Sequence, residues 1–284
     1  MTPYAEVIGS PVAQSKSPLI HGFWLQKMGV EGEYRATQVT KEDVENYLKR
    51  HLADEDWRGC NVTMPLKQAV LPLLGRTMLE ASSISAVNTI VRNGSGELEG
   101  YNTDAAGFLE PLQCSLQERH WFRMARVIGT GGAARAIVHA LGQHGFTVVL
   151  AGREPSKARR LLDELAGEGE HHAVHLDHFA ALTDFAFDDR EGCLDLVVNA
   201  SPLGMRGQPP LRFDWSHAPP GSIAYDIVTD PVRTPFLQAA EEAGFRTLDG
   251  LHMLIGQAAL AFALFFGQPP PREHDAELRA LLLQ

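Results

Sequence analysis

One charged side chain stands alone in an apolar stretch of this chain. Lys67 is the only charged residue between Arg58 and Arg76, and it directly follows a proline and a leucine. When a hydride reduces a ketone, the oxygen becomes an alkoxide that needs a proton, and a lysine beside that oxygen could polarise the carbonyl and deliver the proton. Asp104 is the candidate carboxylate to hold the ammonium group. By residue type alone, a surface lysine on the first turn of a helix is the simpler interpretation.

Hydroxyl, amide and acid side chains recur in short motifs of the same region. Ser15 and Ser17 stand just before a predicted helix, and Thr63 follows a predicted strand. Asn88 lies in an AVNT motif and Asp104 in an NTD motif. Hydroxyls at a helix N-terminus suit a carboxylate, and amides suit hydroxyls, so this set fits a small polyhydroxylated ligand with a carboxylate. Helix capping or a turn explains each residue singly just as well.

A glycine-rich loop predicts a dinucleotide site in the second half of the chain. Gly129, Thr130, Gly131, Gly132 and Ala133 follow a short apolar strand and open a helix, and a second strand comes about twenty residues later. Glycines there let backbone N–H groups approach a pyrophosphate at the positive end of the helix. A glycine turn that binds nothing is the alternative.

The end of that second strand indicates which dinucleotide binds. Arg153 and Lys157 could hold a 2′-phosphate, and the planar guanidinium group suits phosphate well. Glu154 opposes this interpretation, because its carboxylate would repel the phosphate. We therefore expect NADP, with NAD as the alternative. Lys157 is also explained by a solvated helix face.

These residues need a scaffold, and alternating strand-like and helix-like segments predict an α/β fold with mostly parallel sheets. The first unit includes a helix ending at Gly29 and a short helix over residues 66–74. The second, with its βαβ series, predicts a doubly wound Rossmann domain. We expect two domains: residues 1–105 plus a helical tail, 235–284, and residues 106–234.

Composition excludes several classes of partner. The formal net charge of −10 without a Lys/Arg block argues against nucleic acid and anionic membranes, but permits a small anionic ligand. Cys60, Cys114 and Cys193 are widely spaced, which indicates a reducing compartment. The start of the chain lacks the apolar core of a signal peptide, and the apolar run 254–266 is too short to span a bilayer. We expect a cytoplasmic protein, monomeric or homodimeric.

A group of histidines raises the question of a metal. His171, His172, His175 and His178 fall within eight residues. No matching carboxylate or cysteine pattern accompanies them, so we expect no functional metal.

Eight motifs occur in a fixed order along nearly the whole chain: SKSP with the following Ile-His, NVTxPxK, AVNT, NTDxxG, GxGGAxRA, VNASxxGM, DPxxTPFL and MLxGQAxxAF. In these motifs the chain resembles the shikimate dehydrogenase family. The resemblance implies reversible NADPH-dependent reduction of 3-dehydroshikimate to shikimate, a step of aromatic amino-acid (chorismate) biosynthesis. It also implies a substrate-binding domain made of the N-terminal part plus the last helices, with a Rossmann NADP-binding domain between them.

The resemblance also assigns residue roles. It makes Lys67 and Asp104 the catalytic pair, with Lys67 either the proton donor or chiefly an electrostatic anchor. It assigns substrate binding to Ser15, Ser17, Thr63, Asn88 and Gln257. It assigns NADP binding to Gly129, Thr130, Gly131, Gly132, Ala133 and Arg153, with Met205 and Gly250 near the nicotinamide.

Two departures from the family pattern keep a rival open. Thr229 stands where family members often have a tyrosine that contacts the substrate. Gly152-Arg153-Glu154 stands where Asn-Arg-Thr is common. Both are compatible with an NAD-dependent quinate/shikimate dehydrogenase. A non-catalytic ligand-sensing relative is the other rival, and it predicts loss of the pair Lys67 and Asp104, which this chain retains.

Overall fold

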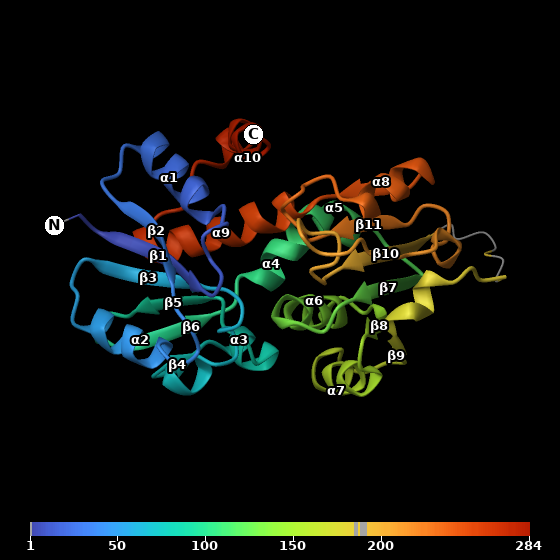
Figure 1. Cartoon of the computed structure of the whole chain (residues 1–284), viewed down its shortest axis with the longest axis horizontal. Helices are drawn as coiled ribbons and strands as arrows, with labels where there is room; N and C mark the ends of the chain where they lie inside the picture. The colour runs from blue at the N-terminus through green and yellow to red at the C-terminus, as the bar shows by residue number, and fades with distance from the viewer. Residues whose placement is uncertain (1, 185–186, 188–191) are drawn as a thin grey trace. The chain divides into compact units, whose positions relative to one another are not determined.

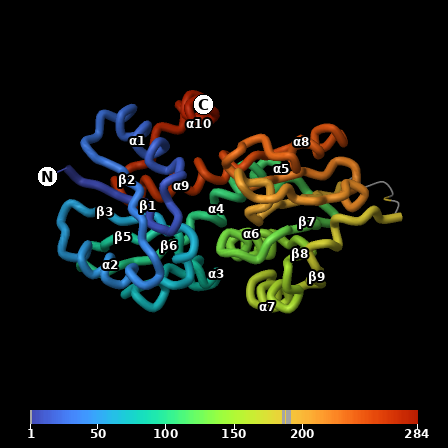
Figure 2. Tube along the Cα trace, in the orientation of Figure 1, coloured from blue at the N-terminus to red at the C-terminus, as the bar shows by residue number. Residues whose placement is uncertain are grey.

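The chain forms two compact units, each built around its own sheet (Figure 1). A computed structural model describes residues 2–184, 187 and 192–284. Unit 1 comprises Met1–Asp104 and Ile255–Gln284, and unit 2 comprises Ala105–Leu254. Within unit 1, the C-terminal helices return to the N-terminal strands (Figure 2).

Unit 1 contains a six-stranded sheet in the order β2-β1-β3-β5-β6-β4. Its strands are β1 (Tyr4–Gly9), β2 (Glu33–Gln38), β3 (Trp57–Val62), β4 (Arg76–Thr77), β5 (Thr89–Arg92) and β6 (Leu98–Tyr101). Its helices are α1 (Ser17–Met28), α2 (Val44–Leu52), α3 (Leu79–Ile84) and α10 (Asp275–Leu282), joined by most of α9 (Gly250–Phe266). The predicted stop of α1 is confirmed: Gly29 adopts the left-handed conformation with φ of 61°.

Strand β1 of unit 1 is buried on both faces. Alternate side chains of β1 point to opposite faces of the sheet. Tyr4 and Ile8 join an apolar cluster with residues of α2 and α3, whereas Ala5 and Val7 join a cluster with residues of α9. Helices therefore pack against β1 from both faces of the sheet.

Two local features of unit 1 differ from the sequence expectation. Residues 66–74 form turns followed by a short 3-10 helix, Leu71–Leu73, because Pro72 lacks the N–H that a regular helix needs. Strands β5 and β6 form an antiparallel hairpin, which was not predicted from the sequence. The dipeptide Asn93-Gly94 at its turn is a recognised hairpin signal.

Unit 2 contains a six-stranded sheet that is parallel throughout, in the order β12-β11-β10-β7-β8-β9. Its strands are β7 (Phe122–Ile128), β8 (Thr147–Gly152), β9 (His172–His175), β10 (Cys193–Asn199), β11 (Ile223–Asp226) and β12 (Arg246–Leu248). Its helices are α5 (Gln113–Gln117), α6 (Gly132–Gln143), α7 (Pro155–Leu165) and α8 (Pro235–Glu242), preceded by α4 (Asp104–Leu109).

The strand order of unit 2 is that of a Rossmann fold. Strand β7 lies between β8 and β10, so the order reverses beside it. Ligands of doubly wound sheets bind at the carboxyl ends of the strands at this switch point. The predicted α/β class with a Rossmann domain is therefore confirmed.

The boundary near the C-terminus differs from the expected one. The sequence predicts that residues 235–254 belong to the first unit, whereas the structure places them in unit 2. The reason is strand β12, which pairs with β11 from Ile223 to Tyr225 and keeps α8 beside the sheet. No helix in the described part of the chain is both long enough and apolar enough to cross a membrane.

Candidate active site

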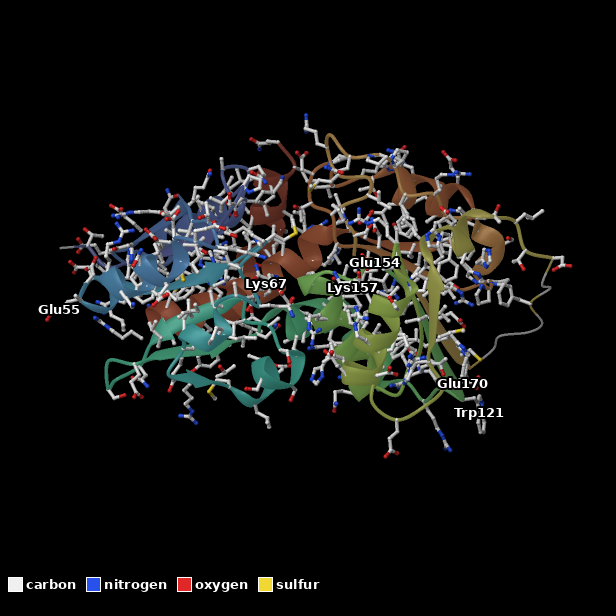
Figure 3. All side chains as sticks on the ribbon, turned by 60° about the horizontal axis from the view of Figure 1, so that its bottom comes forward. Glu55, Lys67, Trp121, Glu154, Lys157 and Glu170 are labelled. Carbon is white, nitrogen blue, oxygen red and sulfur yellow. The ribbon has the colours of Figure 1, made fainter. Side chains whose placement is uncertain are left out.

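Lys67 lies just past the carboxyl end of β3, where the chain turns sharply. The N–H of Thr63 donates to the carbonyl of Ile8, which ties this turn to β1. Leu66 is fully buried beside it and anchors the segment. The N–H of Val87 donates to the carbonyl of Lys67 at 2.8 Å. An otherwise apolar segment is therefore fixed on both sides of one lysine, Lys67, which is labelled in Figure 3.

The structure brings Lys67 and Asp104 together. Nζ of Lys67 lies 2.5 Å from Oδ2 of Asp104, and the two side chains are only 15% and 6% exposed. Water screens such a pair weakly, so the ammonium group is held in one place. Removal of one partner alone would leave an uncompensated buried charge. This geometry excludes the surface-lysine interpretation of Lys67.

Asn88 engages the second oxygen of the Asp104 carboxylate. Its Nδ2 donates to Oδ1 of Asp104 and to Oγ1 of Thr103, both at 2.9 Å. Its Oδ1 accepts from the N–H of Thr103 at 2.8 Å. The amide thus gives both of its hydrogens to protein groups. The Asp104 carboxylate is held from two directions, by Asn88 and by Lys67.

The two serines lie at the start of α1. The N–H of Ser17 donates to Oγ of Ser15 at 3.3 Å, and Ser17 is buried. The N–H of Ser10 donates to the carbonyl of Met64, so the loop that leads to the serines is bound to the turn after β3. Gly9 permits this approach, because a Cβ there would lie 2.4 Å from Cγ2 of Thr63. The serine loop and Thr63 therefore share one end of the sheet.

Gln257 reaches the same network from α9. Its Oε1 lies 3.5 Å from Oγ1 of Thr103, which in turn bonds Asn88. Thus a helix from the end of the chain adds an amide to the group that surrounds Asp104. Every residue of this group belongs to unit 1.

In unit 2, the glycine loop fits a pyrophosphate. Gly129 has φ of 120°, and a Cβ there would lie 2.6 Å from the carbonyl oxygen of Ala200. Gly131 precedes α6, is exposed and has open space where a Cβ would be. The twelve residues of α6 direct its first N–H groups and the positive end of its dipole toward this opening. The loop therefore combines a close backbone contact with an accessible helix N-terminus. Its other residues are Thr130, Gly132 and Ala133.

The predicted 2′-phosphate residues lie at the carboxyl end of β8. Arg153, Glu154 and Lys157 are all exposed. Figure 3 shows Glu154 and Lys157 close together at one end of unit 2, with Trp121 and Glu170 at the other end. Arg153 and Lys157 are thus placed at the same edge of the sheet as the glycine loop, but on the solvent-exposed surface.

The residues expected near the nicotinamide follow β10 and β12. Met205 is half-buried in the loop after β10. Gly250 begins α9, and a Cβ there would lie 2.4 Å from the carbonyl oxygen of Val228. The start of α9 therefore packs directly on the chain that leaves β11, which only glycine allows.

A buried carboxyl group in this region was not predicted from the sequence. Asp226, at the end of β11, is fully buried and accepts from Nδ2 of Asn199 at 3.0 Å and from Oγ1 of Thr234 at 2.7 Å. Burial raises its pKa to about 6. The DPxxTPFL motif contains Thr234, but only the strand pairing reveals the contact. Asp226 ties the ends of β10 and β11 to the start of α8.

The histidine group of unit 2 is used structurally. Nδ1 of His171 accepts from the N–H of Val148 at 3.1 Å, and His172 and His175 begin and end strand β9. Among the described residues, no three His, Cys, Asp or Glu side chains are placed to hold a metal ion.

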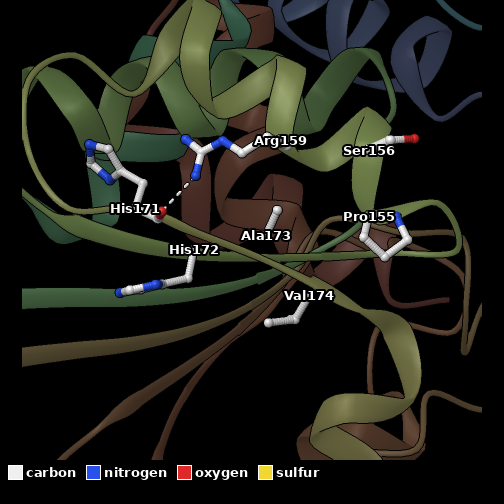
Figure 4. A pocket seen from close by; sticks show the side chains of 7 residues that line it. All are labelled: Pro155, Ser156, Arg159, His171, His172, Ala173 and Val174. Carbon is white, nitrogen blue, oxygen red and sulfur yellow. Dashed lines mark hydrogen bonds between the residues drawn. The ribbon is translucent and has the colours of Figure 1, made fainter.

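An open hollow of about 500 Å³ lies beside these histidines (Figure 4). Pro155, Ser156, Arg159, His171, His172, Ala173 and Val174 line it. The guanidinium of Arg159 donates to the carbonyl of His171 at 2.7 Å and pairs with Asp163. The positive charge of Arg159 is therefore already paired within the protein. None of the predicted site residues lines the hollow.

Comparisons with known proteins agree with this arrangement. Residues 7–90 match the family model described as the shikimate dehydrogenase substrate binding domain, and residues 250–277 match the shikimate 5′-dehydrogenase C-terminal domain. A curated shikimate dehydrogenase (NADP(+)) of Sphingopyxis alaskensis is 50% identical over 99% of this chain and 97% of its own length.

Two solved structures are informative relatives. Shikimate 5-dehydrogenase of Thermus thermophilus, in complex with NADP(H) and shikimate, is 34% identical with a TM-score of 0.79, covering 99% of this chain and all of its own. Quinate dehydrogenase of Corynebacterium glutamicum, in complex with NAD, is 30% identical with a TM-score of 0.82, covering 99% of each chain.

Proposed function

The chain belongs to the shikimate dehydrogenase family, and on that premise we propose that Lys67 and Asp104 catalyse the reversible reduction of 3-dehydroshikimate to shikimate with NADPH. The protein is thus an oxidoreductase acting on a CH–OH group in aromatic amino-acid (chorismate) biosynthesis. The buried contact between Nζ of Lys67 and Oδ2 of Asp104 is the observation that supports this proposal most strongly. A ligand-sensing relative would have no need of such a pair.

The proposed chemistry uses the ammonium group directly. Bound NADPH supplies the hydride that reaches the C3 carbonyl carbon. Lys67 donates its proton to the developing alkoxide, and it accepts the proton when shikimate is oxidised. Asp104 keeps the ammonium group beside the reacting oxygen through their buried ion pair.

The substrate is held by the polar groups around the pair. We assign Ser15 and Ser17 to its carboxylate, and Thr63 and Gln257 to its hydroxyls, because all four come from the elements that meet at this end of unit 1. Asn88 differs from these residues. Both of its amide hydrogens already bond protein groups. We therefore propose that Asn88 lies in the substrate pocket and positions Asp104.

Unit 2 is the proposed NADP-binding domain, and unit 1 the substrate-binding domain. The glycine loop from Gly129 to Ala133 fits the pyrophosphate, and Arg153 with Lys157 would hold the 2′-phosphate through charge-assisted hydrogen bonds. Met205 and Gly250 complete the site on the nicotinamide side.

The first experiment compares four reaction mixtures. Purified protein is mixed with shikimate or quinate, each with NADP or NAD, and reduced nicotinamide is followed by absorbance. We expect a strong signal with shikimate and NADP and a weak one in the other mixtures. Silence in all four would contradict the proposed function.

A second candidate is a quinate/shikimate dehydrogenase that uses NAD. Glu154 favours it, because an exposed carboxylate at the end of β8 disfavours a 2′-phosphate. Thr229, in place of the frequent tyrosine, changes one expected substrate contact. A stronger signal with quinate or with NAD in the same four mixtures would replace the first assignment with this one.

We further propose that the enzyme works in the cytoplasm as a monomer or homodimer. Cys60, Cys114 and Cys193 are all free thiols, which is typical of a reducing compartment. Sedimentation equilibrium at several concentrations measures the oligomeric state, and a stable tetramer would contradict this proposal.

A further inference from the structure

Three buried polar residues of unit 1 have no part in the chemistry described so far. Tyr34 on β2, Asn61 on β3 and Thr89 at the start of β5 are 8%, 6% and 0% exposed. Burial of hydroxyl and amide groups is unfavourable unless each group finds a partner. Their partners therefore show what these residues do.

The partners form one continuous chain of hydrogen bonds. The hydroxyl of Tyr34 donates to Oδ1 of Asn61 at 2.6 Å, and Nδ2 of Asn61 donates to Oγ1 of Thr89 at 2.9 Å. The hydroxyl of Thr89 donates to Oδ1 of Asn88 at 3.0 Å, and Nδ2 of Asn88 donates to Oδ1 of Asp104 at 2.9 Å. Each donor points toward the carboxylate that holds Lys67.

The common direction of these bonds has a physical consequence. Asn61, Thr89 and Asn88 each accept one of these bonds and donate the next, so the bonds polarise one another. The Thr89 hydroxyl and the Thr103 N–H both donate to Oδ1 of Asn88, which leaves only Nδ2 to face Asp104. The hydrogen-bond chain therefore fixes the orientation of the Asn88 amide. This orientation in turn fixes the position of Oδ1 of Asp104.

The Tyr34 end of this hydrogen-bond chain is packed beside Ser17, one of the two serines that we assign to the substrate carboxylate. The ring of Tyr34 stacks on His21 with centroids 3.9 Å apart and planes 4° apart. Burial lowers the pKa of His21 to about 3, so this is a stack of two neutral rings. Burial raises the pKa of Tyr34, which keeps its hydroxyl a donor, and the Ser17 hydroxyl contacts it. The hydrogen-bond chain thus begins at Tyr34, next to Ser17, and ends at Asp104.

We infer that Tyr34, Asn61 and Thr89 are positioning residues for the reaction, which act through Asn88 to orient the carboxylate of Asp104 and thereby the ammonium group of Lys67. This inference rests on the proposed catalytic role of Lys67 and Asp104. None of the three needs to touch the reacting atoms. Their loss should lower the rate of the chemical step more than it weakens substrate binding.

Thr89 offers the cleanest test, because two variants separate its hydroxyl from its shape. Thr89→Val removes the hydroxyl at nearly constant volume, and Thr89→Ser keeps it. We expect Thr89→Val to lower kcat for shikimate oxidation about tenfold, since it leaves buried partners unpaired. We expect KM for shikimate to change by less than about threefold, and Thr89→Ser to retain most of the activity. An unchanged kcat in Thr89→Val would overturn the inference.

A double-variant cycle separates positioning from general destabilisation. Thr89→Val is combined with Asp104→Asn, and kcat is measured at high enzyme concentration so that residual rates are visible. If Thr89 acts through Asp104, its replacement has little further effect once the carboxylate is gone. An equal fold-loss of kcat in both backgrounds would instead show that Thr89 has only a structural role.

Tyr34→Phe repeats the test at the first donor of the hydrogen-bond chain. It keeps the ring on His21 and removes only the hydroxyl, so it decides the question if Thr89→Val fails to fold in thermal unfolding. We expect a kcat loss in the same direction that also vanishes with Asp104→Asn. If Asp104→Asn alone leaves kcat unchanged, the proposed function fails, and this result is distinct from failure of the positioning inference.

Discussion

The proposed substrate site of unit 1 and the proposed cofactor site of unit 2 are built in opposite ways. In unit 1, Lys67, Asp104 and Asn88 are side chains held by buried hydrogen bonds and one ion pair. In unit 2, the glycine loop offers backbone N–H groups, and the residues that would select the cofactor, Arg153 and Glu154, are exposed.

This difference suggests a division of roles: the buried side chains of unit 1 serve proton transfer, and the exposed residues of unit 2 serve the choice between NAD and NADP. Proton transfer needs atoms placed within hydrogen-bond reach, and buried networks provide that precision. A pyrophosphate carries its own charge and is common to NAD and NADP, so backbone groups suffice to bind it. Substitutions in unit 1 should therefore lower kcat, and substitutions in unit 2 should change KM for the cofactor.

The largest effect is expected for Lys67→Ala. Loss of the ammonium group removes the proton donor, so kcat should fall by about 10²–10⁴-fold. Steady-state kinetics with saturating shikimate and NADP measure this change. Lys49→Ala is the matched control, because Lys49 is exposed and its ion pair with Glu45 lies in solvent. Near-normal turnover in Lys67→Ala would remove the chemical role assigned to unit 1.

A smaller effect is expected for Gly131→Ala in the glycine loop. The added Cβ meets nothing within 4 Å in the protein, so folding should be unaffected. It would occupy the space where a pyrophosphate approaches, and KM for NADP should rise about tenfold, as for one lost charge-assisted hydrogen bond.

Thermal unfolding and kcat are the controls for Gly131→Ala. Both should stay close to the wild-type values. A fall in kcat at saturating NADP would show that the loop also affects the chemical step and would weaken the contrast between the two units.

Arg153→Ala should affect one cofactor and spare the other. Only NADP has the 2′-phosphate, so KM for NADP should rise about fivefold while KM for NAD stays constant. Glu154→Gln is the matched variant, and it should lower KM for NADP because it removes a repelling charge. Equal changes for both cofactors would show that these residues do not contact the 2′-phosphate.

A separate prediction concerns stability and its dependence on pH. Burial raises the pKa of Asp226 from 3.8 to about 6. Between these values the folded protein binds more protons than the unfolded chain, so stability falls as pH rises through this window. Asn does not ionise, so Asp226→Asn should gain up to about 3 kcal/mol relative to the wild type over the same window.

Thermal unfolding of both proteins from about pH 4 to about pH 8 tests this expectation. The difference in Tm should move in favour of Asp226→Asn as pH rises. A constant difference would show that the carboxyl group titrates normally despite its burial.

Much of the fold followed from local sequence patterns. Apolar runs flanked by helical segments were sufficient to predict both α/β units, and Gly29 marked the end of α1. The unpredicted elements depend on contacts distant in sequence. Strand β9 contains two histidines and forms by pairing with β8, and β12 has only three residues and forms by pairing with β11. No local pattern specifies such pairings.

The same limit applies to the candidate site. Lys67 and Asp104 were predicted as a pair, and the structure places them in contact. The chain from Tyr34 through Asn61 to Thr89 was not predicted, because it requires the exact register in which Asn61 faces Thr89 across the antiparallel pair β3 and β5. Hydrogen bonds between side chains on different strands follow from register rather than from residue type.

The central claim is that Lys67 and Asp104 act as one unit in proton transfer. The most direct test is kcat of the double variant Lys67→Ala with Asp104→Asn, compared with Lys67→Ala alone. Residues that act as a unit lose their effect together, so the second replacement should change kcat by less than about threefold. A further loss as large as that of Asp104→Asn in the wild-type background would show that the two residues act independently and would contradict the account.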